Sequence, residues 1–415
     1  MLEKKILHID INHCYAQIME MLYPELKNVP MAVGGNEERR SGIILARNLH
    51  AKKFGVKTAE TLREAFDKCP NLTITAPDFS LFIYYSEMVK NIYREYTSHV
   101  ESFGIDEAWL DITHSQKLHG DAEAIMYEIA DRVLNEVGLT VSCGLSYNKI
   151  FAKLGSDLVK PSGRVVISKE NFKEVVWPLN VEELLYVGFK TQEKLNAVKI
   201  MTIGDLANKT KEYMQDLLGK NGEMIWYFAN GFDLSQVMEN GYNEPVKSIG
   251  NSITTPEDIK NRTDAKIVFQ VLAESVASRL RDAKLQAGVI AISLRDVELR
   301  TISRQRKIKQ RTDISSEIME VVISLLDEHY PFFLPLRSIG IKASDLSDNA
   351  GVYQLNFFQD ESIRKRDKDL DICIDEIRDK YGFEVIRKLS TDLNKNLTDF
   401  NPKGEHVIYP VAWFK

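Results

Sequence analysis

The sequence has little cysteine and no long apolar run. Among its 415 residues are four widely spaced cysteines that form no Cys-x-x-Cys pair: Cys14, Cys69, Cys143 and Cys373. This spacing argues against a zinc site or a disulfide framework and is typical of the reducing cytoplasm. No run approaches the ~18 apolar residues that span a bilayer, and the charged N-terminus MLEKKILHID is not that of a signal peptide. We therefore expect a cytoplasmic protein with no membrane partner.

The sequence also lacks low-complexity tracts and internal repeats. Its hydrophobic content of 44% and charged content of 27% are those of an ordinary globular protein. At ~150 residues per domain, the length predicts two to four domains. The net charge of −6 speaks weakly against a nucleic-acid partner, although the distribution of charge matters more than the total.

Strand and helix patterns alternate over residues 1–168. Short apolar runs predict strands, and apolar spacing at i, i+3 and i+4 predicts amphipathic helices. The predicted strands lie at 4–11, in the first part of 41–56 and at 139–148; the predicted helices lie at 13–23, in the second part of 41–56, at 78–100 and at 121–137. This alternation predicts an α/β or α+β domain.

The remaining chain divides by composition. Residues 169–240 form a smaller helical section, in which LLYVGFKTQEKL predicts two helices joined by a tight turn that contains glycine. Such a turn can bind a phosphate, and an ordinary helical hairpin is the alternative. Residues 240–252, rich in Gly, Asn, Pro and Ser, read as a linker. Beyond the linker we predict helices at 264–285 and 312–329, strands within 287–309 and near 336–343, and a charged helix at 361–382.

An adjacent pair of acids, Asp106 and Glu107, interrupts the apolar stretch SFGIDEAWLD. Apolar residues alternate on both sides, which predicts two strands that meet at or near the acids. Asp10 ends another apolar strand, so three carboxylates would converge at one sheet edge if these strands are neighbours. Buried like charges repel each other, and bound Mg²⁺ with oxygen ligands would neutralise them. The alternative is a surface turn at 106–107, with Asp10 as a helix N-cap.

Five motifs, in this order and spacing, resemble those of the Y-family (translesion) DNA polymerases. They are HIDINHCYA, ARNLHAKKFGVK, GIDEAWLDIT, GLSYNKIFAKLGSDLVKPSG and QLNFF, and together they cover nearly the whole chain. The resemblance implies an α+β multidomain fold: a right hand with a ferredoxin-like palm, small fingers, a helical thumb and an α/β little-finger domain. The implied boundaries are palm 1–18 and 78–168, fingers 19–77, thumb 169–240, linker 241–247, little finger 248–347 and a C-terminal tail 348–415.

The resemblance also implies roles for individual residues. Asp10, Asp106 and Glu107 match the catalytic, metal-binding carboxylates, and the carbonyl of Ile11 would complete the ligands of two Mg²⁺ ions. In the family the ions lower the pKa of the primer 3′-hydroxyl and hold the triphosphate for in-line attack. The residues implied to bind the incoming nucleotide are His13, Cys14, Tyr15, Arg47, Asn48, Lys52 and Lys153.

For two of these nucleotide-binding candidates, the resemblance implies a more specific role. Tyr15 lies at the family's steric-gate position, where an aromatic ring beneath the sugar leaves no room for a ribose 2′-hydroxyl; a core aromatic is the alternative. Lys52 lies where many members have an arginine. Either cation neutralises phosphate charge, but lysine lacks the bidentate fork.

Three positions depart from the family pattern. Asn12 stands where many members have a second aspartate, Leu49 replaces a tyrosine common in the polymerase IV branch, and Gly104 replaces a serine. The spacing ARN-x-x-AK-x-x-GVK resembles the catalytic subunit of polymerase V instead. We therefore expect a bacterial relative that lies between these branches, with Arg47 and Asn48 as candidates to replace the contact that Leu49 cannot make.

Basic charge concentrates in the region implied to be the little finger. Residues 246–311 hold fourteen Lys or Arg against seven Asp or Glu, and 299–311 hold six basic residues and no acid. Such a run predicts sequence-independent, salt-sensitive contacts with DNA phosphates, and a solvated strand face is the alternative. The candidates are Arg300, Arg304, Arg306, Lys307, Lys309 and Arg311.

The motif QLNFF resembles the peptide that binds the bacterial sliding clamp. Leu355, Phe357 and Phe358 would fill an apolar groove, and Gln354 would form a hydrogen bond at its edge. A buried core strand is the alternative. Residues 360–415 indicate no function of their own.

These features favour a template-directed, error-prone DNA polymerase with two Mg²⁺ ions. The small residues Gly42 and Ala59 in the implied fingers agree with the family's open site and low fidelity. The expected partners are primer–template DNA, deoxynucleoside triphosphates and the sliding clamp, and we expect a monomer. The alternatives are a nucleotidyl cyclase on a similar palm, against which the basic third domain argues, and a clamp-bound regulator without activity, against which the complete carboxylate set and Lys153 argue.

Overall fold

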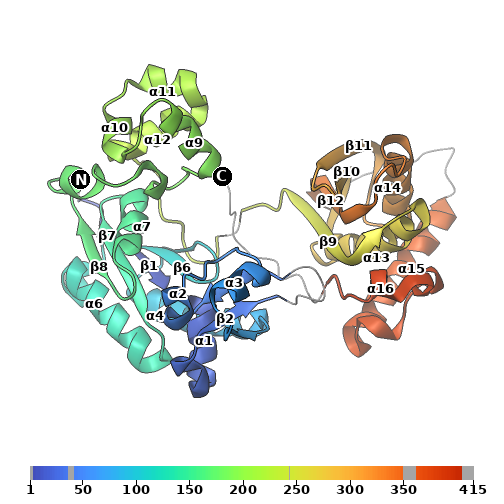
Figure 1. Cartoon of the computed structure of the whole chain (residues 1–415), viewed down its shortest axis with the longest axis horizontal. Coiled ribbons are helices and arrows are strands. Elements are labelled where there is room, and N and C mark those ends of the chain that lie inside the picture. Colours follow the sequence, from blue (N-terminus) through green and yellow to red (C-terminus); the bar gives the residue numbers. More distant parts are fainter. Residues whose placement is uncertain (1–2, 36–41, 243, 349–360, 404–415) are drawn as a thin grey trace. The chain divides into compact units, whose positions relative to one another are not determined.

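The structure, a computed structural model, describes residues 3–35, 42–242, 244–348 and 361–403. The chain divides into two compact units, treated separately below (Figure 1). The division lies between Glu244 and Pro245. No helix in the described ranges is long and apolar enough to cross a membrane.

A five-stranded mixed sheet forms the centre of the first unit. Its strands lie in the order β5–β6–β1–β7–β8, and all neighbours are antiparallel except β7 and β8. The strand bounds are β1 Ile6–Ile11, β5 Val100–Ser102, β6 Glu107–Asp111, β7 Val141–Ser146 and β8 Arg164–Ile167. Every residue of the central strand β1 is buried, as expected for a strand with helices on both faces of its sheet.

The helices of the first unit confirm the helices predicted from apolar spacing over residues 1–168 and add several short ones. Their bounds are α1 Cys14–Leu22, α2 Leu49–Lys53, α3 Leu62–Lys68, α4 Phe79–Tyr96, α5 Gln116–His119, α6 Ala122–Arg132, α7 Lys149–Leu158, α8 Phe172–Val176, α9 Phe189–Ala197, α10 Ile203–Ala207, α11 Lys211–Leu218 and α12 Lys220–Ala229. A three-stranded sheet, β3–β2–β4, accompanies α2 and α3. Its bounds are β2 Met31–Gly34, β3 Ile44–Arg47 and β4 Thr73–Thr75.

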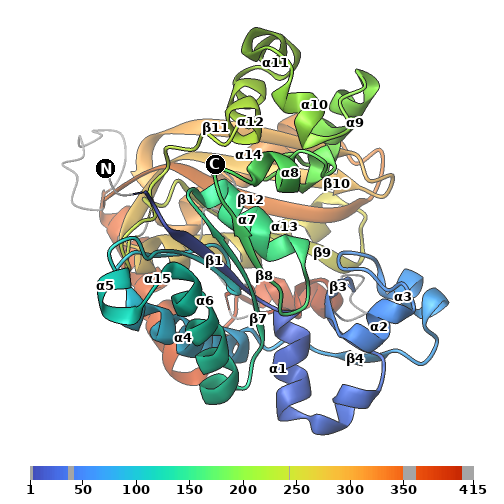
Figure 2. The same cartoon turned by 90° about the vertical axis from the view of Figure 1, so that its left-hand side faces the viewer.

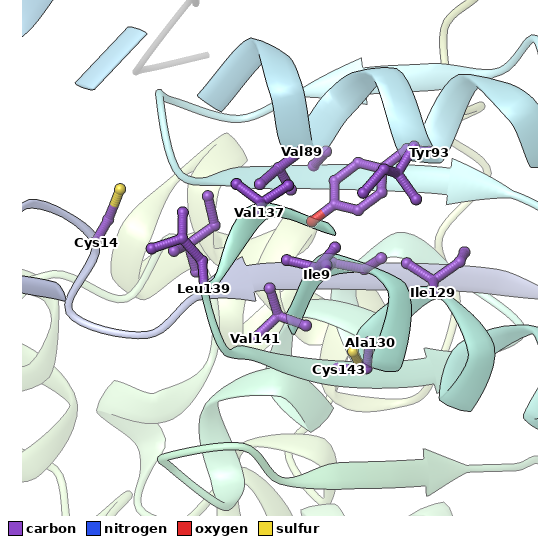
Figure 3. Close-up of a cluster of buried hydrophobic side chains, with 14 of the residues drawn as sticks. Ile9, Cys14, Val89, Tyr93, Ile129, Ala130, Val137, Leu139, Val141 and Cys143 are labelled. Carbon is purple, nitrogen blue, oxygen red and sulfur yellow. The ribbon is translucent and has the colours of Figure 1, made fainter. Parts of the chain in front are cut away.

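Alternation along β1 sends its side chains to two different faces of the sheet. Ile9 belongs to the apolar core formed with α4 and α6, and Figure 3 shows it beside Val89 and Tyr93 of α4. His8 and Asp10 point to the opposite face, where both have partners on α7. Helix α7 packs there against β1, β7 and β8 (Figure 2). The polar residues of β1 therefore share the face that α7 covers.

A glycine on β7 allows α7 to approach the sheet closely. A Cβ atom on Gly144 would lie 2.0 Å from the carbonyl oxygen of Ala152 and 2.5 Å from the backbone nitrogen of Ser156. Asn148 caps α7 by accepting a hydrogen bond from the backbone N–H of Phe151. The close approach brings the polar side chains of α7 onto the face that carries Asp10.

The first of the two helices predicted around LLYVGFKTQEKL (184–195) does not form as a regular helix. Val181–Glu183 form only a short 3₁₀ turn, and α9 begins after Gly188. Tyr186 adopts a left-handed φ of 72° between them. A helix does not continue through such a residue, because a side chain in that conformation crowds the backbone.

The second unit is a four-stranded antiparallel sheet with two long helices on one face. The strand order is β11–β10–β12–β9. The bounds are β9 Ser248–Ile259, α13 Arg262–Asp282, β10 Leu285–Asp296, β11 Thr301–Thr312, α14 Ser315–His329 and β12 Leu336–Asp348. The prediction of a linker over the whole of 240–252 was wrong at its end, because 248–252 pair with β12. Gly250 and Ser252 signal a loop by composition, but here they are small residues of a strand.

The C-terminal residues 361–403 pack on the second unit through ion pairs and two buried apolar residues. Helix α15 (Glu361–Tyr381) confirms the predicted charged helix. Arg281 of α13 bridges Asp371 at 3.0 Å and Asp375 at 2.7 Å. Leu397 and Phe400 lie in the apolar core of the unit. This segment is therefore integral to the second unit.

The packing of α7 gives a direct test. We expect Gly144→Ala to lower the free energy of unfolding by about 1–3 kcal/mol, because the added methyl group meets backbone atoms that cannot rotate away. Urea denaturation of the whole chain, followed by circular dichroism, measures the change. Gly188→Ala is the matched control, because no atom lies within 4 Å of its Cβ position; equal stability of the two variants would contradict the account.

Candidate active site

Antiparallel pairing of β1 with β6 brings the three predicted acids together. Asp10 lies directly opposite Glu107 in the ladder. The backbone N–H of Ile11 donates a hydrogen bond of 3.0 Å to the carbonyl of Asp106. Asp10 is only 5% exposed. The two strands are neighbours, as the convergence of the three acids required, and the acids lie at one end of the central strands.

Two lysines place their positively charged ammonium groups beside the acids. Lys153 Nζ on α7 lies 3.0 Å from Glu107 Oε2 and 3.7 Å from Asp10 Oδ2. Lys160 forms an ion pair with Asp10 and lies 2.8 Å from Asp157. Sequence reasoning identified Lys153 but missed Lys160, for which the only signal was its place in the KPSG end of a longer motif.

Burial and mutual repulsion perturb the acids. Burial, with the nearby charge of Glu107, raises the pKa of Asp106 to about 6 and raises the pKa of Asp10. For Glu107, contact with His8 and Lys153 outweighs burial and lowers its pKa. Burial lowers the pKa of Lys153, but the charges of Glu107 and Asp157 outweigh it and raise that pKa above its ordinary value. The site therefore holds closely spaced negative charge that requires cations.

The donor atoms suit a hard divalent cation. Mg²⁺ prefers oxygen ligands such as carboxylates and backbone carbonyls. The site offers only such donors. They are the carboxylates of Asp10, Asp106 and Glu107 and the backbone carbonyl of Ile11. Within the described ranges, no three His, Cys, Asp or Glu side chains are arranged as a ready metal-binding group. The lysine ammonium groups lie against the same carboxylate oxygens instead. The residues therefore fit a divalent cation by chemistry.

The predicted nucleotide residues near the start of α1 lie next to the acids in the chain. Tyr15 is half-buried, and its ring stacks on Phe82 at 4.4 Å and meets Phe79 edge-on at 5.9 Å. Cys14 is buried, and His13 begins the helix with a left-handed φ of 36°. The aromatic contacts from α4 fix the plane of the Tyr15 ring.

The other nucleotide candidates lie at the end of β3 and on α2. Arg47 donates a hydrogen bond of 3.1 Å to Thr58 Oγ1, and Lys52 is exposed. Asn48 is fully buried, caps α2 by accepting from the N–H of Ala51, and donates to the carbonyl of Val29. The amide of Asn48 therefore fixes the turn that carries Arg47 and Lys52.

The six basic candidates for DNA binding in the second unit divide into two groups. Three of them form ion pairs: Arg300 with Asp296, Arg306 with Glu328 and Arg311 with Asp345. The other three, for which the described part of the chain offers no ion pair, are Arg304, Lys307 and Lys309. Sequence reasoning missed Lys342, an exposed residue of β12 opposite Ala291. Strand alternation was the available signal, because its neighbours Ile341 and Ala343 are buried.

The four clamp candidates Gln354, Leu355, Phe357 and Phe358 fall outside the described residues. Of the four cysteines, Cys373 is exposed and the others are buried, and all four thiols are free.

Comparison with known proteins identifies the family. A model described as the impB/mucB/samB family matches residues 9–157, and a model of the C-terminal domain of that family matches residues 246–357. A DNA polymerase IV of Acetivibrio thermocellus is 43% identical over 387 residues, which cover 93% of this chain and 97% of that protein. A DNA polymerase IV of Bacillus velezensis is 36% identical over 388 residues, which cover 92% of each chain.

A solved structure shows the same fold. It is a Y-family DNA polymerase chimera of Dbh and Dpo4, which matches with a TM-score of 0.73 and 22% identity over 83% of this chain and 100% of that chain. Its likeness confirms the predicted multidomain polymerase fold. With family models over both units and close relatives along nearly the full length, this chain belongs to the impB/mucB/samB family, the Y family of DNA polymerases.

Proposed function

We propose that this Y-family polymerase extends a primer by metal-assisted phosphoryl transfer at Asp10, Asp106 and Glu107. Membership of the family makes the chain a DNA-directed DNA polymerase of the translesion type. The observation that carries the proposed site is that Asp10 pairs directly opposite Glu107 in the ladder. The backbone N–H of Ile11 also donates a hydrogen bond to the backbone carbonyl of Asp106, which holds Asp106 beside them. Three carboxylates at one end of the sheet, Asp10 on β1 and the adjacent acids at the start of β6, are suited to hold two cations.

The reaction assigns a role to each charged group. Two bound Mg²⁺ ions would activate the primer 3′-hydroxyl and neutralise charge on the triphosphate. Asp10, Asp106, Glu107 and the carbonyl of Ile11 would hold them. Lys153 and Lys160 now contact these carboxylates. Beside these carboxylates, both ammonium groups would also lie within reach of the phosphates of an incoming nucleotide and would neutralise their charge.

The proposed domains follow the boundaries that the resemblance implies. The five-stranded sheet with α4, α6 and α7 serves as the palm, 19–77 as the fingers, 169–240 as the thumb and 248–347 as the little finger. In the fingers, Arg47 and Lys52 are the proposed triphosphate contacts, with Asn48 as the residue that holds their turn. This assignment would put the nucleotide between the acids and α2.

The face of the second sheet that lacks helices is the proposed DNA-binding surface. Lys307 and Lys342 belong to it, because their partners in β10 are Val289 and Ala291 rather than Ile290 and Ile292, which lie in the apolar core beneath the helices. Five small residues line part of a hollow of about 350 Å³, together with Lys342 and others: Gly250, Ser252, Ala291, Ser293 and Ser303. Small side chains with lysines around them suit the phosphate backbone, which is bound without reading the base sequence.

Isosteric loss of one carboxylate tests the catalytic proposal. We expect Asp106→Asn to reduce the rate of primer extension by at least about 10³-fold, because a metal ligand contributes several kcal/mol to the transition state. Gel-based extension of a labelled primer, on intact and lesion-bearing templates, measures the rate. Asp131→Asn, a surface residue that pairs with Arg164, is the control. Extension by Asp106→Asn at the wild-type rate would exclude the assigned site.

Tyr15 is the proposed steric gate against ribonucleotides. Because its ring is fixed by Phe79 and Phe82, removing it opens space beside α1. We expect Tyr15→Ala to narrow the preference for deoxynucleotides over ribonucleotides by roughly 10- to 100-fold, the range that steric exclusion of a small group supplies. The ratio of kcat/KM for the two sugars measures it. Tyr15→Phe should keep the preference, and an unchanged ratio in Tyr15→Ala would count against the gate.

The bacterial sliding clamp is the proposed partner of residues 354–358. We expect Leu355→Ala with Phe357→Ala to abolish the stimulation of synthesis by the clamp, because both anchors of the apolar groove are lost. Basal synthesis should stay unchanged. Primer extension with and without purified clamp separates the two effects, and equal loss of both activities would indicate a structural role instead.

A further inference from the structure

Asn12 is a buried amide at the point where β1 ends. The residue is 3% exposed and directly follows Ile11, the last residue of the strand. Its backbone is held on both sides. The N–H donates a hydrogen bond of 3.0 Å to the carbonyl of Thr140, and the carbonyl accepts one of 2.6 Å from Nε2 of Gln17. The side chain of Asn12 therefore extends from a fixed part of the sheet.

Four hydrogen bonds occupy the side-chain amide of Asn12. Its Oδ1 accepts from the Ser142 hydroxyl at 2.7 Å and from the backbone N–H of Ser162 at 3.4 Å. Its Nδ2 donates to the hydroxyls of Thr140 at 3.0 Å and of Ser162 at 3.3 Å. An asparagine amide can donate two hydrogen bonds and accept two, so its whole capacity is used. The backbone N–H of Ser162 can only donate, which fixes the side of the amide that carries the oxygen.

Two of these bonds tie an exposed loop to the sheet. Ser162 belongs to the loop 159–163 between α7 and β8, where it has a left-handed φ of 63°. Lys160, which forms the ion pair with Asp10, lies two residues earlier in the same loop. Two links thus join the loop to β1 and its end: Asp10 to Lys160, and Asn12 to Ser162 two residues further along both segments. The first link depends on charge, and the second does not.

The ion pair by itself does not fix where Lys160 lies. Its ammonium group lies beside both Asp10 and Asp157, on a long and flexible stem, and its side chain is 36% exposed. A bound phosphate would add a third attraction for the same charge. The reach of such a side chain is set by the backbone from which it extends, and the bonds between Asn12 and Ser162 hold that backbone to the sheet.

We propose that Asn12, acting through Ser162, is a positioning residue that holds Lys160 at the phosphates of the incoming nucleotide. The inference rests on the phosphate contact of Lys160 in the proposed function. Asn12 itself contacts neither the nucleotide nor the reacting atoms in this arrangement. Because the amide is neutral, it ties the loop without adding negative charge near Asp10, as an aspartate at this position would.

A double-mutant cycle tests whether Asn12 acts through Lys160. Isothermal titration calorimetry of the whole chain with Mg²⁺ and a primer–template that ends in a dideoxynucleotide gives the Kd of the next deoxynucleoside triphosphate without reaction. We expect Lys160→Met to raise this Kd by about 10- to 100-fold, the effect of one lost hydrogen bond to a charged group. Asn12→Ala should raise it by about 3- to 10-fold and Ser162→Ala by about threefold. Neither should raise it further in a chain that carries Lys160→Met.

The controls separate this inference from the proposed function. Ser146→Ala removes another buried hydroxyl of β7, bonded to the carbonyl of Ile167 at 2.7 Å, and should leave the Kd unchanged. Ser162 is exposed, so its variant keeps the test available if Asn12→Ala does not fold. If Lys160→Met binds the nucleotide as wild type, the proposed phosphate contact is wrong and the inference fails with it. If Lys160→Met weakens binding while Asn12→Ala and Ser162→Ala do not, or if their effects multiply with that of Lys160→Met, only the positioning role is overturned.

Discussion

Two carboxylates face each other within a buried antiparallel ladder, and the first unit is built to meet the charge that results. Asp10 and Glu107 repel each other and lose hydration at the end of a strand with no exposed residue. Burial of like charges costs free energy, so the presence of both acids requires a gain elsewhere. Lys153 and Lys160 supply positive charge in this structure, and divalent cations would supply more. The sheet can hold the acids because a large apolar core packs against its other face.

Helix α7 links the stability of the core to the chemistry of the acids. Its apolar residues Ile150, Phe151 and Leu154 belong to an apolar core cluster. Lys153 and Ser156 lie on the side that faces β1, spaced i and i+3, so one turn delivers a cation to Glu107 and a hydroxyl to His8. The absence of a side chain at Gly144 sets how closely this turn can approach. The residues of the motif that resembles a catalytic signature therefore also determine how α7 packs on the sheet.

Much of the first unit was predictable because its elements have strong local patterns. An acid pair between alternating apolar residues identified the β5–β6 hairpin, and apolar spacing identified α4 and α6. The sequence could give the pairing of β1 with β6 only as a condition. Which strands are neighbours in a sheet is decided by tertiary structure, and the sequence of either strand alone does not show it. Lys160 was missed for the same reason: it gains its meaning from a partner about 150 residues away, and no periodicity marks it. Helix α15 was predictable, but its packing on the second unit was not, because it packs mainly through ion pairs such as Arg281 with Asp371, whose partners lie about 90 residues apart.

The basic run of the second unit shows how strand geometry limits an argument from charge. Successive residues of a strand point to opposite faces, so a run of six basic residues cannot act as one patch. Arg306 reaches Glu328 on α14, and Arg311 reaches Asp345. A guanidinium paired with a carboxylate offers DNA less attraction, because part of its charge is already neutralised. Lys342, outside the run, shares the face of Lys307 through the ladder. The positive charge that a phosphate backbone would meet therefore depends on which face of the sheet each basic residue occupies. A count of basic residues along the sequence includes some whose charge is already neutralised, and it omits Lys342.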